Sequence, residues 1–149
     1  MRLVALAPLA LAGCSLFMHS IEKPTAEVRG VSVSNASFTG VSGELALDVT
    51  NPNGFGVPLS GIDWQLSIGG ARAVTGTVQL SQTIPARGLA PVTTTLSIAA
   101  TDAIAVGGAL AAGARNYQID VELHFSTSVG QLDVAVQHAG QLGDAISLR

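Results

Sequence analysis

Residues 45–70 read LALDVTNPNGFGVPLSGIDWQLSIGG, and this stretch decides the fold class. From Glu44 to Thr50 and again from Asp63 to Ile68, an apolar side chain occupies every second position. These apolar residues are Leu45, Leu47, Val49, Trp64, Leu66 and Ile68. Alternation with a period of two is typical of strands that have one buried face and one face in water. The stretch therefore predicts two half-buried strands separated by a loop.

The same alternation continues downstream in three further segments. Their apolar positions are Val92, Thr94, Leu96 and Ile98; Tyr117, Ile119, Val121, Leu123 and Phe125; and Leu132, Val134 and Val136. Weaker candidates lie at Glu27–Phe38, at Ala73–Leu80 and near Ala145–Leu148. About seven short strands separated by turn signals predict an all-β protein with an antiparallel β-sandwich architecture.

Glycine and proline mark the turns between these strands. Gly69-Gly70 predicts a tight hairpin, because both residues tolerate a positive φ. Residues Ile84-Pro85-Ala86-Arg87-Gly88 predict a turn before the next strand. Gly76 lies inside a strand pattern, and we expect a β-bulge there.

Residues 101–112 break the strand pattern and predict one short helix. Thr101 can serve as its N-cap, and Asp102 is favourable in the first turn. Ile104, Leu110 and Ala111 are the residues expected to face inward. Gly107-Gly108 has poor helix propensity, so the helix should be short.

The first fourteen residues have the features of an export signal. Met1-Arg2 provides a positive start, Leu3–Ala12 is apolar, and small residues precede Cys14. This organisation is that of a secretory signal, because the run is about half as long as a spanning helix. Residues 11–14, Leu-Ala-Gly-Cys, resemble the lipobox of bacterial lipoproteins. That resemblance implies cleavage before Cys14 and lipidation of its thiol, whereas the alternative is an ordinary signal peptide with an incidental cysteine.

The resulting organisation has three parts. Residues 1–13 are expected to form the signal peptide, 14–25 the lipidated N-terminus and tether, and 26–149 the folded domain. Several acyl chains on Cys14 would hold the domain to a membrane firmly, since a single chain binds only marginally. Ser15 is not aspartate, and by resemblance to enteric sorting this points to the outer membrane, facing the periplasm.

Composition excludes several classes of protein. Of the 149 residues, 48% are hydrophobic and 11% charged, which argues against intrinsic disorder. The chain has a net charge of −3 and lacks the basic patch of a nucleic-acid-binding protein. We therefore expect no nucleic-acid partner. The single cysteine and three scattered histidines cannot form a Cys/His zinc motif.

The longest motif resembles a known family. A strand ending in Asn51-Pro52-Asn53, the step Val57-Pro58 and a strand with Trp64 and a glycine turn are similar to the late-embryogenesis-abundant type 2 family, also called the WHy domain. Gly76 and the Ile84–Gly88 turn extend the resemblance, which covers roughly residues 25–125. It implies a fibronectin-III-like β-sandwich with one helix, agreeing with the strand pattern. It also implies a role in desiccation or cold stress.

The Asn-Pro-Asn motif also has a structural explanation. Pro52 cannot donate to a ladder and ends the strand, while the residue before a proline stays extended. The side chain of Asn51 or Asn53 can bond nearby backbone in an Asx turn. A binding role is the alternative, and Phe55 and Val57 beside the motif are the expected contact surface if they are exposed.

Catalytic patterns are missing from the sequence. His19, His124 and His138 are far apart, and His124 falls on a polar strand face. By the same alternation, Asp63 and Asp133 fall on wet strand faces. Asp120 and Glu122 share a face and could meet a cation, but such pairs usually serve solubility. No nucleophile elbow or phosphate-binding loop occurs. We therefore expect no enzymatic activity, no cofactor and no metal site.

Two functions remain in competition at this point. The first is a non-enzymatic, membrane-tethered stress protein, monomeric, that protects protein or membrane clients. The second is a binding or structural module of the cell envelope, which would recognise a protein through an exposed strand edge or hold an apolar ligand between its sheets. A large dry cavity or apolar patch would favour the second.

Overall fold

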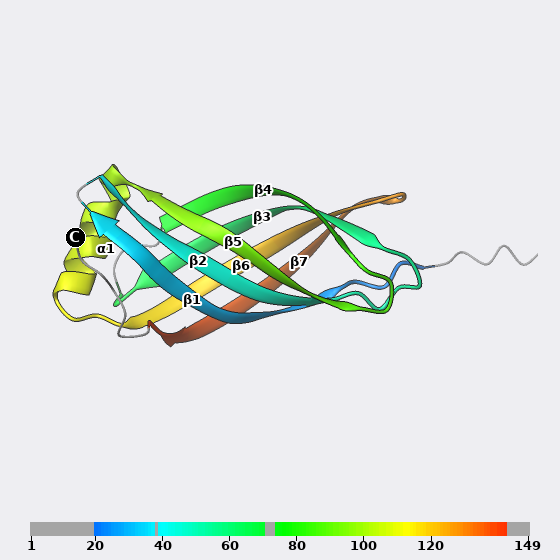
Figure 1. The fold of residues 1–149 in the computed structure, drawn as a ribbon, viewed down its shortest axis with the longest axis horizontal. Helices are drawn as coiled ribbons and strands as arrows, with labels where there is room; N and C mark the ends of the chain where they lie inside the picture. The colour runs from blue at the N-terminus through cyan, green and yellow to red at the C-terminus, as the bar shows by residue number, and fades with distance from the viewer. Residues whose placement is uncertain (1–19, 38, 71–73, 143–149) are drawn as a thin grey trace, which may run out of the picture.

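The computed structural model describes residues 20–37, 39–70 and 74–142 of the chain. Within these ranges it contains seven strands and one helix (Figure 1). In chain order they are β1 (Thr25–Ser37), β2 (Gly40–Thr50), β3 (Val57–Ile68), β4 (Val74–Ile84), β5 (Leu89–Ala99), α1 (Ala100–Ala111), β6 (Asn116–Thr127) and β7 (Gly130–Gln141). The predicted segment near Ala145–Leu148 lies outside the described residues.

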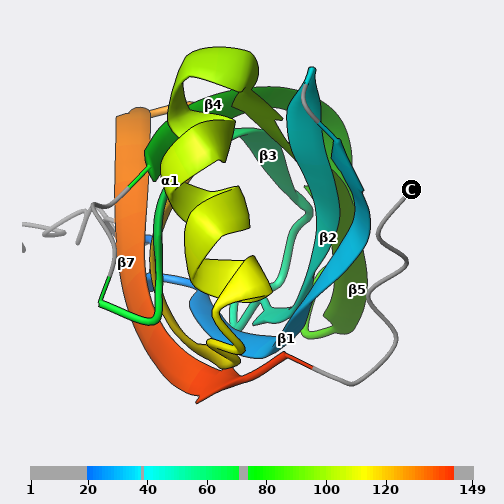
Figure 2. The same ribbon diagram turned by 90° about the vertical axis from the view of Figure 1, so that its left-hand side faces the viewer.

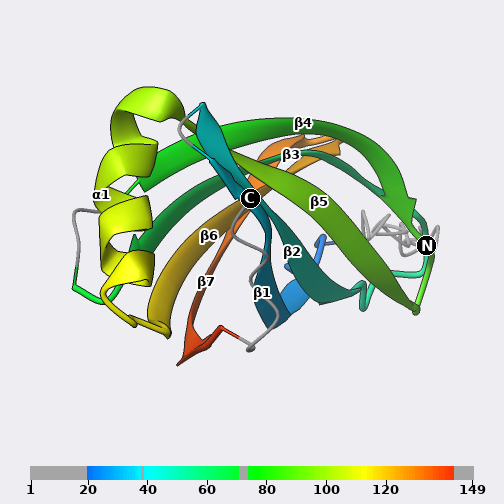
Figure 3. The same cartoon turned by 60° about the vertical axis from the view of Figure 1, so that its left-hand side comes forward.

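The described strands form two antiparallel sheets that pack face to face. One sheet has the order β1-β2-β5 and the other the order β4-β3-β6-β7. Figure 3 shows both sheets strongly twisted and running along the long axis of the molecule. The predicted fold class, a fibronectin-III-like or immunoglobulin-like β-sandwich of about seven strands with one short helix, is confirmed.

The predicted apolar faces form the core between the sheets. Leu45, Leu47, Val49, Ile119 and Leu123 have no measurable exposure, and the other predicted inward positions of β3, β5 and β6 are buried. Leu132, Val134 and Val136 of β7 also face inward, but they are only half-buried. Both edge strands of the four-stranded sheet behave in this way, since Val78 and Leu80 of β4 are also half-buried. The inward positions of β1 and β5, the edges of the three-stranded sheet, are buried.

The residues of two predicted turns can be located. Gly69 and Gly70 have φ values of +58° and +73°, as the glycine pair predicted. Residues 71–73, which follow this pair, lie outside the described residues, and the described part of β4 begins at Val74. The turn at residues 85–88 is tight, and the amide of Gly88 donates to the carbonyl of Pro85 at 3.2 Å.

The β-bulge predicted at Gly76 is wrong. Gly76 pairs in regular register with Trp64, and the irregularities occur elsewhere, in β1 and between Leu59 and Gly61. The indole of Trp64 occupies the space that a Cβ on residue 76 would need. Glycine is present here because a neighbouring ring approaches the backbone closely, which is the other reason for a glycine inside a strand.

Helix α1 lies across one end of the sandwich, as Figure 2 shows from that end. Its N-cap is Ala99 without a side-chain hydrogen bond, so the predicted cap at Thr101 is wrong, while Asp102 does lie in the first turn. The buried residues are Ala103, Val106 and Leu110. Of the predicted inward positions only Leu110 is therefore correct; Ile104 is 78% exposed and Ala111 is exposed. In the described part of the chain, no helix has the length and apolarity required to span a membrane.

Candidate functional site

The Asn-Pro-Asn motif joins two loops and the N-terminal segment at the end of the sandwich opposite α1. Asn51 is fully buried, and its Nδ2 donates to the carbonyls of Phe55 (2.7 Å), Pro85 (3.1 Å) and Ile84 (3.2 Å). Its Oδ1 accepts from the backbone amide and the side-chain Nδ2 of Asn53, both at 2.9 Å. One side chain thus holds the β2–β3 connection against the end of β4.

Backbone hydrogen bonds reinforce the same joint. The amide of Asn51 donates to the carbonyl of Gly88, and the amide of Arg87 donates to the carbonyl of Asn53. Arg87 has a φ of +49°, which is unusual for a residue with a side chain. The Asn53 bond is one of the contacts that hold the turn in this conformation.

Asn53 attaches the N-terminal segment to this joint. Its Oδ1 accepts from the amide of Glu22 at 2.9 Å, and its Nδ2 donates to the carbonyl of Glu22 at 2.8 Å. The side-chain amide of Asn53 therefore pairs with the backbone of Glu22 through one donor and one acceptor, as a residue of a neighbouring strand would. Pro24 is buried and β1 begins at Thr25, so the segment predicted as a tether already belongs to the sandwich from Glu22 onward.

We call this end of the molecule the junction end. It consists of the β2–β3 connection (51–56), the β4–β5 turn (85–88), the β6–β7 turn (128–129) and the N-terminal segment at Glu22 (Figure 1, right). Phe55 is 45% exposed here, as the contact-surface hypothesis requires, but Val57 is fully buried as the first residue of β3. Cys14, the predicted lipidation site, lies outside the described residues.

A second polar constellation crosses the outer face of the four-stranded sheet. His124 of β6 lies between two carboxylates: Nδ1 is 2.7 Å from Oδ1 of Asp133 on β7, and Nε2 is 3.0 Å from Oδ2 of Asp63 on β3. Thr77 of β4 donates to Oδ1 of Asp63 at 2.6 Å, and Gln131 donates to Asp133 at 2.8 Å. We call these five residues the polar ladder, because it links all four strands of the sheet.

The polar ladder shifts the pKa of each titratable member toward its charged form. Hydrogen bonds to Asp133 first and then to Asp63 raise the pKa of His124 above its ordinary value of 6.5. Hydrogen bonds from Thr77 and then His124 lower the pKa of Asp63, and those from Gln131 and then His124 lower that of Asp133. A protonated imidazole donates on both sides, so the cation completes the ladder.

The signs of these shifts predict how stability depends on pH. The contribution of protonated His124 is fully present below about pH 6.5 and is lost as pH rises through the raised pKa. The aspartate contributions are present above about pH 3.8 and are lost as pH falls through their lowered pKa values. The ladder therefore stabilises the fold most between these limits.

We accordingly expect His124→Gln to lower the melting temperature more at about pH 5.5 than at about pH 9, because only the imidazolium is attracted to both carboxylates. Thermal unfolding followed by circular dichroism measures the difference at each pH. The control is the Asp63→Asn, Asp133→Asn background, in which the effect of His124→Gln should no longer depend on pH. An equal loss at both pH values in the wild-type background would contradict the prediction.

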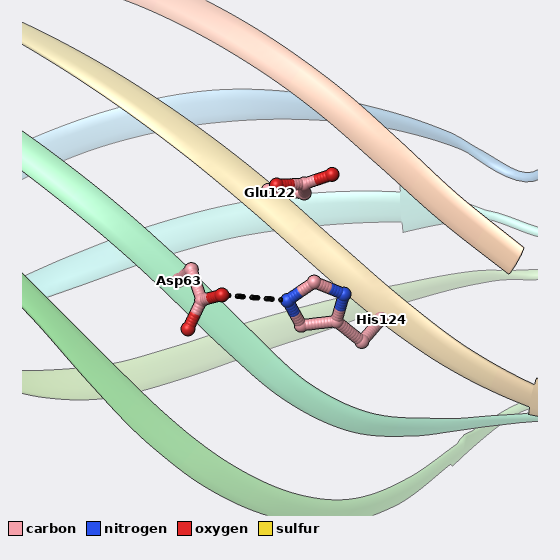
Figure 4. A group of neighbouring side chains, drawn as sticks. All are labelled: Asp63, Glu122 and His124. Atoms are coloured by element: carbon pink, nitrogen blue, oxygen red, sulfur yellow. Dashed lines mark hydrogen bonds and ion pairs between the residues drawn. The ribbon is translucent and has the colours of Figure 1, made fainter. Parts of the chain in front are cut away.

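Figure 4 shows Asp63 and His124 in contact, with Glu122 beside them. One ligand atom from each of these three residues lies within 4.8 Å of the other two, so the group has the spacing of a metal site. Yet both nitrogens of His124 are already engaged with carboxylates, and cation binding through Nε2 would have to replace the Asp63 contact. The arrangement therefore acts first as a cross-strand polar network.

The outer face beside the polar ladder is hollowed into a shallow groove of about 470 Å³. It runs over β4, β3, β6 and β7, and its wall includes Gln65, Thr75, Asp120 and Gln137. The Oδ1 atom of Asp120 is buried there without a hydrogen-bond partner. This groove is open and is lined by both polar and apolar groups, whereas an apolar ligand requires an enclosed apolar chamber.

The hydroxyl groups near His124 are not activated as nucleophiles by its imidazole. Ser60 donates to the backbone carbonyl of His124, and Thr77 donates to Asp63. Among the described residues, no serine, threonine or cysteine side chain is hydrogen-bonded to an imidazole nitrogen. The polar ladder thus lacks the nucleophile–base contact on which acyl-transfer sites depend.

The alternation places Asp63, Asp133 and His124 on wet strand faces, but it does not show that they lie together. His124 lies opposite Asp133 and Gly61, and Asp63 lies opposite Thr77 and Glu122. These pairs depend on strand order and on the irregularity after Leu59, neither of which can be read from alternation. The alternation of polar and apolar residues is the only signal in the sequence.

Comparison with known proteins places the chain in a family. No curated protein matches its sequence. A solved late embryogenesis abundant (LEA) protein is 22% identical, with a TM-score of 0.61 over 82% of this chain and 71% of that chain. A protein from Arabidopsis thaliana is 16% identical, with a TM-score of 0.67 over 83% of both chains.

A protein from Archaeoglobus fulgidus is 10% identical, with a TM-score of 0.56 over 86% of this chain and 100% of that chain. At these identities the structural likeness concerns the fold alone. The family model described as "Late embryogenesis abundant protein" matches residues 46–140, which is more than half of the chain. The resemblance found in the sequence is confirmed, and the chain belongs to the LEA_2 family.

Proposed function

We propose that this protein is a non-enzymatic LEA type 2 lipoprotein that is tethered to a bacterial membrane through Cys14 and protects protein or membrane clients during drying or cold. The observation that carries the proposal is the family match over residues 46–140. The lipobox-like Cys14 supplies the anchor, and Ser15 favours the outer membrane, facing the periplasm.

The surface of the sandwich supports a protective role. The outward positions of edge strands β4 and β5 are exposed and uncharged, and hydroxyl groups dominate them. This hydroxyl-rich face takes its residues from the outer sides of both sheets and consists of Thr75, Gln79, Ser81, Thr83, Thr93, Thr95 and Ser97. Gln82 joins the two strands by donating to the carbonyl of Pro91 at 3.1 Å.

Such a face can take the place of water during drying. Polar groups of a client lose their hydrogen bonds when water leaves, and an unpaired polar group is costly. Hydroxyl and amide groups both donate and accept, so they can satisfy either kind of partner. The lack of charge on this face lets it approach clients of either sign.

The test compares a dehydration-sensitive enzyme dried and rehydrated with the full chain, or with an inert globular protein of equal mass. The client should retain more activity with the full chain. A variant with Thr75, Gln79, Thr93 and Thr95 changed to glutamate should protect less, and its circular dichroism should show an intact fold. Equal recovery with the wild-type chain and the inert protein would refute the proposal.

The alternative, an envelope module that holds an apolar ligand, is disfavoured by the interior. The buried residues of both sheets form one continuous core cluster. A hollow of about 470 Å³ among the described residues lies on the outer face of the four-stranded sheet instead. Recognition of a protein partner through a strand edge remains compatible with the fold.

A further inference from the structure

Exposed apolar side chains are concentrated at the junction end. Among the described residues, four large hydrophobic side chains are well exposed. Phe55 (45%), Leu89 (60%) and Val129 (76%) lie in or beside the three loops of the junction end, whereas Ile104 (78%) lies on α1. Figures 1 and 3 place α1 at the opposite end of the long axis.

Strand pairing independently places these residues at one end. Leu89 pairs with Thr50, directly before the Asn-Pro-Asn motif, and the amide of Asn51 donates to the carbonyl of Gly88. Leu59 near the start of β3 pairs with Phe125 near the end of β6, which brings the β6–β7 turn to the same end. Single exposed apolar residues are ordinary on any surface, but three on the loops of one end form a common face.

The N-terminal segment leaves the domain at this same end. Glu22 is fastened to Asn53, and Lys23 donates to the backbone carbonyl of Asp133 at 3.2 Å. Only five residues separate Cys14 from Ser20, the first described residue. Even fully extended, a chain of that length spans about 20 Å. A lipid on Cys14 would therefore keep the junction end close to the bilayer.

We propose that the junction end is a membrane-contacting surface, with Phe55 and Leu89 inserted into the headgroup region of the bilayer that holds Cys14. The inference rests on the proposed anchor. Apolar side chains on such loops can enter the lipid while the polar backbone beside them stays among the headgroups. Arg87 is exposed beside Gly54, next to Phe55, and can meet a lipid phosphate. Lys23 is exposed near β7 and adds a second cation at this end, where the carboxylates of Glu22 and Asp133 are also exposed.

This contact would orient the molecule. The long axis of the sandwich would point away from the membrane, with α1 farthest from the lipid. The hydroxyl-rich face would then run along the side of the molecule and stay free for clients. A flexible tether without this contact would leave the orientation random.

The experiment uses the full lipidated chain with one added cysteine, because a lipidated Cys14 cannot react with a thiol-directed dye. Phe55→Cys and Leu89→Cys report on the junction end, and Ile104→Cys on α1 is the control, an apolar position that is more exposed than either. Each variant carries an environment-sensitive fluorophore and is reconstituted in vesicles of phosphatidylethanolamine and phosphatidylglycerol. Intact mass and flotation with the vesicles test the anchor separately.

Labels at residues 55 and 89 should shift their emission to shorter wavelengths on reconstitution and be quenched by nitroxide-bearing lipids, whereas the label at residue 104 should not. Water-like emission at 55 and 89 on a lipidated, floating protein would overturn the inference and leave the anchor standing. Shielded labels that lipid nitroxides fail to quench would also overturn it, in favour of cover by residues 15–19 or a second copy. An unlipidated Cys14 would overturn both the proposed anchor and the membrane contact of the junction end.

Discussion

Asn51→Ala is expected to lower the free energy of unfolding by about 3–5 kcal/mol, close to the limit for a single substitution. The side chain has no exposed surface, and it bonds three backbone carbonyls and two groups of Asn53. Alanine would leave these partners unsatisfied in a region from which water is excluded. Each buried polar group left unpaired costs about 1–3 kcal/mol, although relaxation lets some find new partners.

Urea unfolding followed by the fluorescence of Trp64, the single tryptophan, measures this loss. The matched control is Asn35→Ala, the same substitution on the exposed face of β1, which should change the free energy by less than about 0.5 kcal/mol. A second diagnostic comes from Asn51→Asp, which keeps the acceptor oxygen but removes the Nδ2 donor and buries a charge. It should be no less damaging than alanine. A loss below about 1 kcal/mol for Asn51→Ala would show that the joint does not depend on this side chain.

The strand faces could be predicted because each sheet has one dry face and one wet face. That condition ties burial to sequence parity, so Leu45, Trp64 and Phe125 could be assigned without knowing their neighbours. The rule weakens at the two edges of the four-stranded sheet. The inward residues of β7 follow the parity but are only half-buried, because alternation carries no information on how fully the opposite sheet covers a strand.

The helix shows a different limit. Its hydrophobic pattern is weak because alanine and glycine fill most positions, so size could not indicate which face is buried. Ala103 and Val106 face inward instead of the larger Ile104. The helix also begins directly from β5, with no residue free to act as a separate cap. Here the geometry of the strand-to-helix connection, and not local capping chemistry, decides where the helix starts.

The two polar sites differed in the same way. The Asn-Pro-Asn motif is local in sequence, so its role in ending β2 could be predicted from proline chemistry. Its bonds to Glu22, Ile84 and Pro85 could not be predicted, because they join segments more than 30 residues apart. The polar ladder is entirely non-local, since each contact crosses between strands. Only the register of β3, β6 and β7 brings its members together.

Gly76→Ala is expected to cost about 2–3 kcal/mol, because the added methyl group would overlap the indole of Trp64 across the β3–β4 pair. The indole is rigid and buried, with 4% of Trp64 exposed, so it cannot swing away into solvent. Gly30→Ala in β1 is the matched control, since a Cβ there meets nothing within 4 Å. Thermal and urea unfolding followed by circular dichroism compare the two without relying on tryptophan fluorescence.

A double-mutant cycle separates this overlap from any intrinsic preference for glycine at position 76. Trp64→Leu removes the ring, and although it destabilises the core by itself, it makes room for the methyl group. In that background Gly76→Ala should cost less than about 1 kcal/mol or even stabilise the strand, because alanine loses less backbone entropy than glycine on folding. An unchanged cost would mean that the backbone at residue 76, rather than the indole, requires glycine. The same cycle tests the fold at the point where the sequence suggested a bulge, since only a regular pairing of residues 64 and 76 places the ring over this glycine.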